Sequence, residues 1–214
     1  HMIGEELPIS CAIVHPRLND GFSFGEICAA LAVWYFLAAL KLEMNSHENL
    51  KEYLDLVAIA TIADVMPLKD VNRVVVKSGI DDIKTSKRPA MSAIKQRLAK
   101  EEFCSSDIAY KISPRLNSAG RLSLASEAFA FLRAKDHKEA LELFDRLTNL
   151  NEERKKIELA VTNEALEMAN KDDEIIVVAK EGWHEGVVGI VASRLAGALK
   201  KPSIVLSIDG DCAK

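Results

Sequence analysis

Cysteine is scarce in this sequence of 214 residues, and it follows no spacing typical of a metal site or a disulfide framework. The four cysteines stand 17, 76 and 108 positions apart and include no C-x-x-C pair: Cys11, Cys28, Cys104 and Cys212. Disulfide-rich domains and structural zinc sites place cysteines at short, regular spacings. The sequence therefore predicts reduced thiols, as in a cytoplasmic protein.

Long hydrophobic runs are missing as well. The longest, residues 27–40, has 14 residues, whereas a membrane-spanning helix needs roughly 20. This run predicts a buried core helix. The common nucleotide-binding patterns are also absent: the glycines at 182, 186 and 189 match neither G-x-G-x-x-G nor the P-loop.

Charge is nearly balanced overall but uneven along the chain. The composition is that of a soluble globular protein, with 49% hydrophobic residues and 28 Lys and Arg against 32 Asp and Glu. Residues 69–121 carry a local charge of +6, while the remainder carries −10. A basic middle favours an anionic partner such as nucleic acid, and the alternative is a solvated face rich in lysine.

The first part of the chain reads as one strand followed by helices. Residues 9–15 predict a short buried strand, and Ser23 with Glu26 predicts a capping box for a helix over 24–44. Further helices are expected in four segments: 47–65, 71–84, 88–100 and 106–112.

The second part predicts a long helix and then a βαβ unit. Residues 136–171 lack Gly and Pro and are apolar at both ends and polar in the middle, which suits a helix bridging two domains. The alternative is two helices joined by a polar turn. Beyond it, residues 174–180 and 202–209 predict buried strands and 187–200 predict the crossover helix. The sheet would then be incomplete.

Asp64 is a candidate metal ligand. It lies in the apolar segment ATIADVMPL, residues 60–68, and a buried carboxylate is costly unless it is paired or bound to a metal. Mg²⁺ and Mn²⁺ prefer such oxygen ligands. The alternative is a surface aspartate at a helix end, and one Asp cannot hold a catalytic metal centre.

A second candidate site is SPRLNSAGRL, residues 113–122. Arg115, Asn117 and Arg121 surround a small Ser-Ala-Gly turn, and planar guanidinium groups suit phosphate oxygens. The expectation is an anionic substrate, and the alternative is a helix-capping loop with exposed arginines.

The third candidate is GWHEGVVGIVASRL, residues 182–195, between a strand and a helix. Such loops direct backbone N–H groups and the positive end of the helix dipole toward a ligand. His184 is its candidate active-site group, with a structural histidine as the alternative. Trp183 could stack on a base or pack in a core.

These three segments, in this order, resemble the RecJ-type single-stranded-DNA exonucleases of the DHH phosphoesterase superfamily, and the likeness covers nearly the whole chain. The resemblance implies an α/β fold: the C-terminal part of a DHH domain over 3–135, mostly helical here, a connector helix over 136–171, and the start of a βαβ DHH-associated domain over 172–214.

The resemblance also implies roles for single residues. Asp64 matches an aspartate of a two-metal centre that uses Mn²⁺ or Mg²⁺. Arg115, Asn117 and Arg121 match a polar block that faces the scissile phosphate. His184 matches a histidine that the associated domain turns toward the same cleft. The implied activity is metal-dependent 5′ to 3′ hydrolysis of single-stranded DNA in repair and recombination.

The Asp-His-His segment that names the superfamily would precede this chain, and a phosphate-binding loop would follow it. We therefore expect the 214 residues alone to be inactive and to retain little metal affinity. The implied partners are single-stranded DNA, a single-strand-binding protein and a helicase, and the expected state is a cytoplasmic monomer without membrane contact. Two alternatives remain: a related phosphodiesterase acting on nanoRNA or cyclic dinucleotides, and a non-catalytic nucleic-acid-binding scaffold.

Overall fold

The structure, a computed structural model, describes residues 6–18 and 22–214. The chain forms two compact units, which we call unit 1 (residues 1–114) and unit 2 (residues 115–214). Each unit has its own cluster of buried apolar side chains. The predicted domain limits at residues 135 and 171 stay a prediction.

Residues 9–15 do not form the predicted buried strand. The segment has no regular secondary structure, Ile9 is fully exposed and Val14 is 64% exposed. A strand needs a neighbour that satisfies its backbone N–H and C=O groups. Within the described ranges, β-pairing is confined to three strands of unit 2, so this apolar run has no strand to pair with.

The apolar helix that follows is shorter and more exposed than predicted. Helix α1 spans Ala29–Glu43, with Cys28 at its N-cap and no side chain capping it, so the predicted capping box does not form. Within α1, Leu31 is fully buried, whereas Phe36 is 50% exposed. A helix that is apolar on every face buries only the faces that meet a neighbour, and α1 packs on one side against the next two helices.

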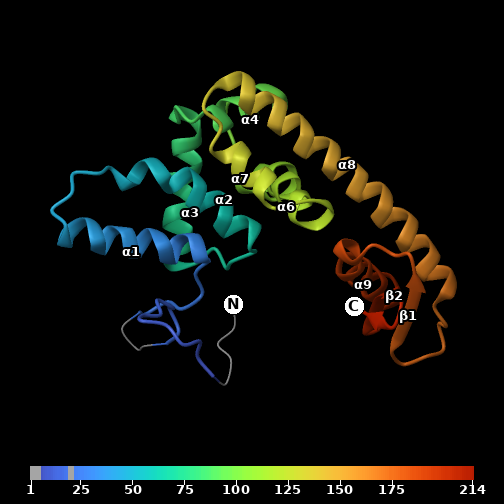
Figure 1. Cartoon of the computed structure of the whole chain (residues 1–214). Helices are drawn as coiled ribbons and strands as arrows, with labels where there is room; N and C mark the ends of the chain where they lie inside the picture. Colours follow the sequence, from blue (N-terminus) through green and yellow to red (C-terminus); the bar gives the residue numbers. More distant parts are fainter. Residues whose placement is uncertain (1–5, 19–21) are drawn as a thin grey trace. The chain divides into compact units, whose positions relative to one another are not determined.

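The rest of unit 1 is helical, as predicted (Figure 1). The elements are η1 (Leu50–Tyr53), α2 (Leu54–Ala63), α3 (Asp70–Thr85), α4 (Pro89–Leu98), α5 (Ser105–Asp107) and the π-helical turn η2 (Ile108–Ile112). Helices α2 and α3 lie close together because Gly79 has no side chain. A Cβ at this position would come within 2.1 Å of the Leu54 carbonyl oxygen.

The turn predicted within SPRLNSAGRL is wrong, because residues Ser113–Leu122 form helix α6. Pro114 stands in its first turn, where a backbone N–H is not required. The Ser118 hydroxyl donates to the Arg115 carbonyl at 2.6 Å, so a small polar residue is accommodated inside the helix. Helix α7 (Ser126–Leu132) follows.

The long helix is confirmed as one continuous element, which excludes the two-helix alternative. Helix α8 spans His137–Met168, 32 residues or about 48 Å. Asp136 caps its start by accepting the Glu139 N–H at 2.9 Å. Its polar middle is not uniformly solvated, because Asn151 and Glu158 are buried.

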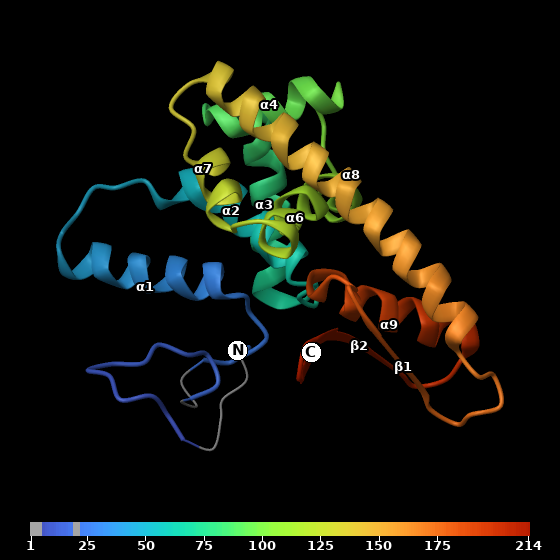
Figure 2. The same ribbon diagram turned by 45° about the vertical axis from the view of Figure 1, so that its right-hand side comes forward.

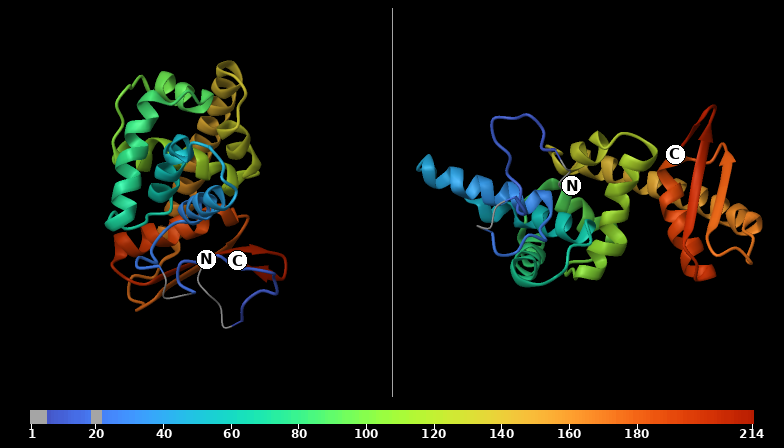
Figure 3. Two further views of the ribbon diagram at one scale, coloured as in Figure 1. Left: turned by 90° about the vertical axis from the view of Figure 1, so that its left-hand side faces the viewer. Right: turned by 90° about the horizontal axis from the view of Figure 1, so that it is seen from below.

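The βαβ unit is confirmed. Strands β1 (Ile176–Glu181) and β2 (Ser203–Asp209) pair in parallel, with Val178 opposite Val205, and helix α9 (Glu185–Leu199) connects them (Figure 3). A short strand that was not predicted, β3 (Cys212–Ala213), pairs antiparallel with β2. Helices α8 and α9 pack together (Figure 2), and both contribute to the buried cluster beside the sheet.

Candidate functional site

Two of the three predicted site segments meet at Gly186. The Arg121 guanidinium donates from Nη1 to the Gly186 carbonyl oxygen at 3.0 Å, and the Gly186 N–H donates to His184 Nδ1 at 3.0 Å. A Cβ on Gly186 would lie 2.2 Å from the Arg121 carbonyl oxygen. The C-terminal end of α6 therefore approaches the N-terminus of α9 as closely as a glycine permits. We call Arg121, His184 and Gly186 the Gly186 junction.

The turn before α9 positions His184. Gly182 adopts φ = +81°, a left-handed conformation that favours glycine, and turns the chain at the end of β1. His184 is then the N-cap of α9 with an extended backbone. Its half-buried side chain satisfies one of the first N–H groups of the helix, which have no partner inside the helix.

Trp183 packs in the core of unit 2, which is the second of the two roles considered for it, and it does not present its ring for stacking on a base. The side chain is 5% exposed, and its indole N–H donates to Glu164 on α8 at 2.9 Å. Its backbone carbonyl accepts the Ser207 hydroxyl from β2. These contacts fix the loop that carries His184 onto the sheet and α8.

Arg115 has a different environment from Arg121. Its Nε donates to the Thr148 hydroxyl at 3.1 Å, and the guanidinium carbon lies 5.6 Å from the centre of the Phe144 ring. Burial lowers the pKa of the Arg115 guanidinium below its usual value, and the nearby Glu152 carboxylate opposes that change. The side chain thus packs α6 against α8.

Asn117 and Arg121 share a face of α6, because they are four residues apart. Both side chains are exposed. Arg115 lies about 120° around the helix axis from Arg121. The structure therefore brings Arg121 and His184 to the same residue, Gly186, but does not place Arg115 on the same side of α6 as Arg121.

Asp64 is exposed, so the expectation of a buried carboxylate that needs a partner is wrong. It is the C-cap of α2, where its backbone N–H donates to the Ala60 carbonyl at 2.9 Å. Helix α2 ends at Ala63, one residue before Asp64, and Asp64 therefore lies at the surface. Its role as a metal ligand stays a prediction.

The residues that the structure describes do not assemble a metal centre. Asp64 offers a hard oxygen ligand suited to Mn²⁺ or Mg²⁺, but across residues 6–18 and 22–214 no three His, Cys, Asp or Glu side chains are grouped so that they could hold an ion. No catalytic step through a metal is derived from these residues.

Part of the positive charge in residues 69–121 is neutralised within unit 1. Asp107 is buried and accepts from Lys100 at 2.5 Å and from Lys111 at 2.9 Å. These hydrogen bonds hold the pKa of the Asp107 carboxyl well below its usual range. Arg88 pairs with buried Asp55 at 3.3 Å. Asp107 is already counted in the net charge of +6, whereas Asp55 lies outside residues 69–121, so the Arg88–Asp55 pair lowers the charge available to an anion below that value.

The sequence did not reveal the buried ion cluster between α8 and α9. Glu158 is 2% exposed, and its two carboxylate oxygens accept from Arg154 and Arg194, each at 2.5 Å. Arg154 also donates to Asn151 at 3.1 Å. The four-residue spacing of Arg154 and Glu158 was a usable signal, but Arg194 comes from a distant segment.

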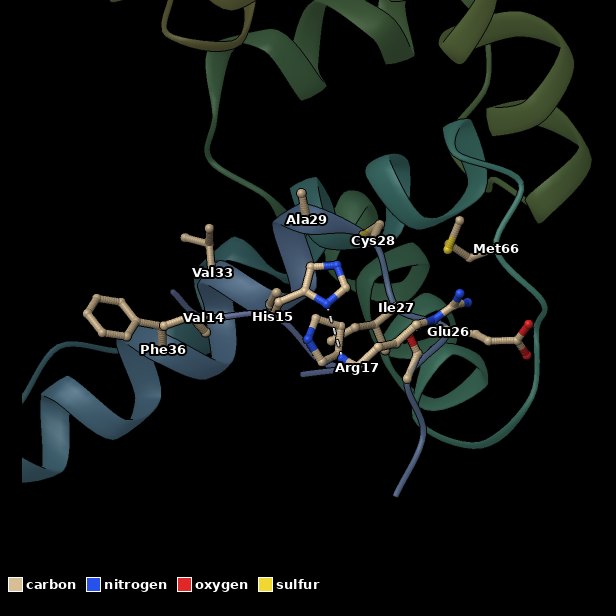
Figure 4. A pocket seen from close by; sticks show the side chains of 13 residues that line it. Val14, His15, Arg17, Glu26, Ile27, Cys28, Ala29, Val33, Phe36 and Met66 are labelled. Atoms are coloured by element: carbon tan, nitrogen blue, oxygen red, sulfur yellow. Dashed lines mark hydrogen bonds between the residues drawn. The ribbon is translucent and has the colours of Figure 1, made fainter. Parts of the chain in front are cut away.

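Cavities are also formed by described residues of unit 1, away from these residues in sequence. One, of about 490 Å³, is lined mainly by apolar side chains around the start of α1, and His15 and Arg17 are among its polar lining residues (Figure 4). Another, of about 540 Å³, is polar and lies beside Asp55 and Asp82. Burial and the neighbouring carboxylates raise the pKa of Asp82, and Lys51, Lys87 and Arg88 also line this cavity.

A helical unit, a long helix and a βαβ segment define an α/β protein of the DHH type, and comparisons agree with that class. No family model matches the chain. The single-stranded-DNA-specific exonuclease RecJ of Bacillus subtilis is 37% identical over 98% of this chain and 27% of its own length. The RecJ of Escherichia coli is 33% identical over 99% of this chain and 40% of its own length.

Solved structures give the same result. A RecJ from Thermus thermophilus in complex with Mn²⁺ is 32% identical, with a TM-score of 0.88, over 97% of this chain and 31% of that one. An exonuclease RecJ bound to manganese is 32% identical, with a TM-score of 0.86, over 97% of this chain and 52% of that one. The chain belongs to the RecJ family. It spans 27–40% of the length of the curated relatives that it matches.

Proposed function

We propose that this protein is a metal-dependent exonuclease that hydrolyses the phosphodiester bonds of single-stranded DNA from the 5′ end, in repair and recombination. One observation carries the proposal: similarity to single-stranded-DNA-specific exonucleases extends over nearly every residue of the chain, at 32–37% identity. The Gly186 junction adds physical support, because a guanidinium and an imidazole both contact the backbone of the same glycine. Both are common ligands of phosphate oxygens.

The residues divide into three proposed roles. Arg121 and Asn117, exposed on one face of α6, bind backbone phosphates of the strand, and His184 contacts the reacting phosphate. Arg115 supports this surface from the α8 side through Thr148. Asp64 supplies one carboxylate ligand for Mn²⁺ or Mg²⁺, which stabilises the leaving oxygen when it is bound.

We propose further that the 214 residues by themselves have little or no activity, because Asp64 has no companion ligands among the residues that the structure describes. The test compares this chain with the intact Bacillus subtilis relative on a single-stranded oligonucleotide labelled at either end, with Mn²⁺. We expect the intact relative to release mononucleotides from the 5′ end and this chain to release none. Mn²⁺-dependent degradation by this chain, free of contaminating nuclease, would contradict the proposal.

A substitution at Asp64 tests the metal role in a complete chain. Asp64→Ala should abolish turnover and leave most of the oligonucleotide affinity, because phosphate contacts to arginine do not depend on this carboxylate. Retained turnover in this variant contradicts the metal assignment.

The proposed setting is a cytoplasmic monomer that meets single-stranded DNA together with a single-strand-binding protein and a helicase. No helix in the described part of the chain combines the length and hydropathy needed to cross a bilayer. Light scattering of the purified chain should give the mass of one copy, and a dimer mass would contradict this part of the proposal.

A further inference from the structure

The hydrogen bond between Gly186 and His184 determines where the imidazole carries its proton. The donor is a backbone N–H, and the acceptor is Nδ1, 3.0 Å away. A ring nitrogen that accepts a hydrogen bond has no proton of its own, so in the neutral ring the proton is on Nε2. The N-cap position of His184 thereby fixes the tautomer of the side chain.

The second ring nitrogen is available to a ligand. His184 is half-buried, and within residues 6–18 and 22–214 its Nε2 has no hydrogen-bond partner. The neighbouring carboxylate, Glu185, is occupied by Lys214 at 2.6 Å. No described residue beside the ring therefore supplies an acceptor for the Nε2 proton, and an external acceptor can take that place.

The surroundings of the ring are rich in donors. Arg121 uses one nitrogen, Nη1, for the Gly186 carbonyl and keeps its exposed side chain beside the same residue. The N-terminal end of α9, 15 residues long, adds the positive end of a helix dipole. A negatively charged group that only accepts hydrogen bonds, such as a phosphate oxygen, fits these donors.

We propose that His184 binds a nonbridging phosphate oxygen of the strand as a hydrogen-bond donor through Nε2, held in this tautomer by Gly186, and does not remove a proton from the attacking water. The inference rests on the proposed function for the identity of the ligand. It makes Gly186 a positioning residue, because its N–H acts through the imidazole ring.

The tautomer is tested directly by a long-range ¹H–¹⁵N spectrum of the 214-residue chain labelled with ¹⁵N-histidine. Loss of one set of signals in the His184→Asn variant assigns the ring. We expect a pyrrole-like Nε2, which carries the proton, and a pyridine-like Nδ1. The reverse pattern overturns the proposal whatever the activity of the protein.

The donor role is tested with matched variants and a 5′-phosphorylated single-stranded dT oligonucleotide, by fluorescence anisotropy at low salt. Asparagine is a good N-cap, so His184→Asn keeps the contact to Gly186 but has no group at the position of Nε2. We expect an unchanged melting temperature and roughly tenfold weaker binding. His184→Gln can place its amide nitrogen near the position of Nε2 and should recover part of the affinity.

Equal binding by the wild type and His184→Asn overturns the donor role, and so does the absence of any binding by the wild type. Failure of the proposed function looks different. In that case the wild type prefers an RNA or double-stranded oligonucleotide, while the nitrogen pattern and the loss in His184→Asn persist on the preferred strand.

Discussion

Gly186 is a residue whose backbone has contacts on both sides. Its N–H donates a hydrogen bond to His184, and its carbonyl oxygen accepts one from the Arg121 side chain. Its α-carbon lies so close to the Arg121 carbonyl oxygen that there is no room for a methyl group. Glycine is required here for close approach, since its φ is not in the left-handed region. A side chain at this position would separate α6 from α9.

Gly186→Ala should therefore weaken both folding and oligonucleotide binding. The methyl group must displace backbone, and we expect a loss of about 1–3 kcal/mol in the free energy of unfolding. Gly189→Ala is the matched control in the same helix, because a Cβ there meets nothing within 4 Å. That variant should be neutral or more stable by about 0.5–1 kcal/mol. Urea denaturation of both variants would refute the argument if Gly186→Ala were the milder change.

Asp107 makes a pH-dependent contribution to unit 1. Its folded-state pKa is depressed by Lys100 and Lys111, so its stabilisation is fully present above the unfolded pKa of about 3.9 and is lost as the pH falls below that value. Asp107→Asn should cost about 1–3 kcal/mol at pH 7 and only somewhat less at pH 3, because the depressed pKa keeps the folded-state carboxylate ionised there.

The control for this substitution is Asp81→Asn. Asp81 is 63% exposed at its side chain and pairs with Lys84 at 3.9 Å. A pair of this kind contributes little in water, so its removal should leave the melting temperature nearly unchanged at both pH values. An equal effect of the two substitutions at pH 7 would contradict the importance of the buried carboxylate.

At the scale of elements, Glu158 holds α8 and α9 together. Glu158→Ala leaves the guanidinium of Arg154, 14% exposed, without its carboxylate partner. We expect a cost of about 2–3 kcal/mol, below the about 3–5 kcal/mol of a fully buried pair because Arg194 can reach water.

Glu152→Ala is the matched control on the same helix, since Glu152 is half exposed and pairs with an equally exposed Lys155. Thermal unfolding should separate the two variants clearly. A small effect of Glu158→Ala would mean that the cluster is not needed to pack α8 on α9.

The elements that could be predicted from the sequence pack against elements that are close to them in the sequence. Helix α8 and the β1-α9-β2 unit follow from periodicity and local signals, and their core lies within a short stretch of chain. Residues 9–15 have strand-like composition, but no strand among the described residues pairs with them. The segment 113–122 has turn-like composition, yet Ser118 and Gly120 are tolerated inside a helix.

The same distinction applies to the candidate site. Residue types indicated Arg121 and His184 separately, but their meeting at Gly186 depends on a contact 65 residues apart in sequence. Arg115 differs from Arg121 only in its environment, which composition does not show. Asp64 is exposed because α2 ends at Ala63, and helix ends are the least predictable feature of a sequence.

At the scale of the whole molecule, charge distribution matters more than the net charge of −4. Binding of single-stranded DNA should weaken as salt rises, with a slope of log K against log salt of about −0.7 for each phosphate neutralised. Arg121→Gln should therefore make the slope about 0.7 less steep. Lys138→Gln, an exposed substitution outside residues 69–121, should leave the slope unchanged.

The slopes are obtained from anisotropy titrations of a dT oligonucleotide at several salt concentrations. An identical slope for the wild type and Arg121→Gln would show that this guanidinium does not neutralise a phosphate. A change in both variants would point to a general loss of positive charge and not to a specific contact.

The cap on Gly186 also makes this single amide an informative reporter. Amides in the first turn of a helix have no carbonyl partner inside the helix and exchange rapidly with solvent. The Gly186 amide is protected only while the His184 ring stays in place. Hydrogen–deuterium exchange at this one position therefore measures how often the ring swings out, and a ligand that holds the ring should slow it.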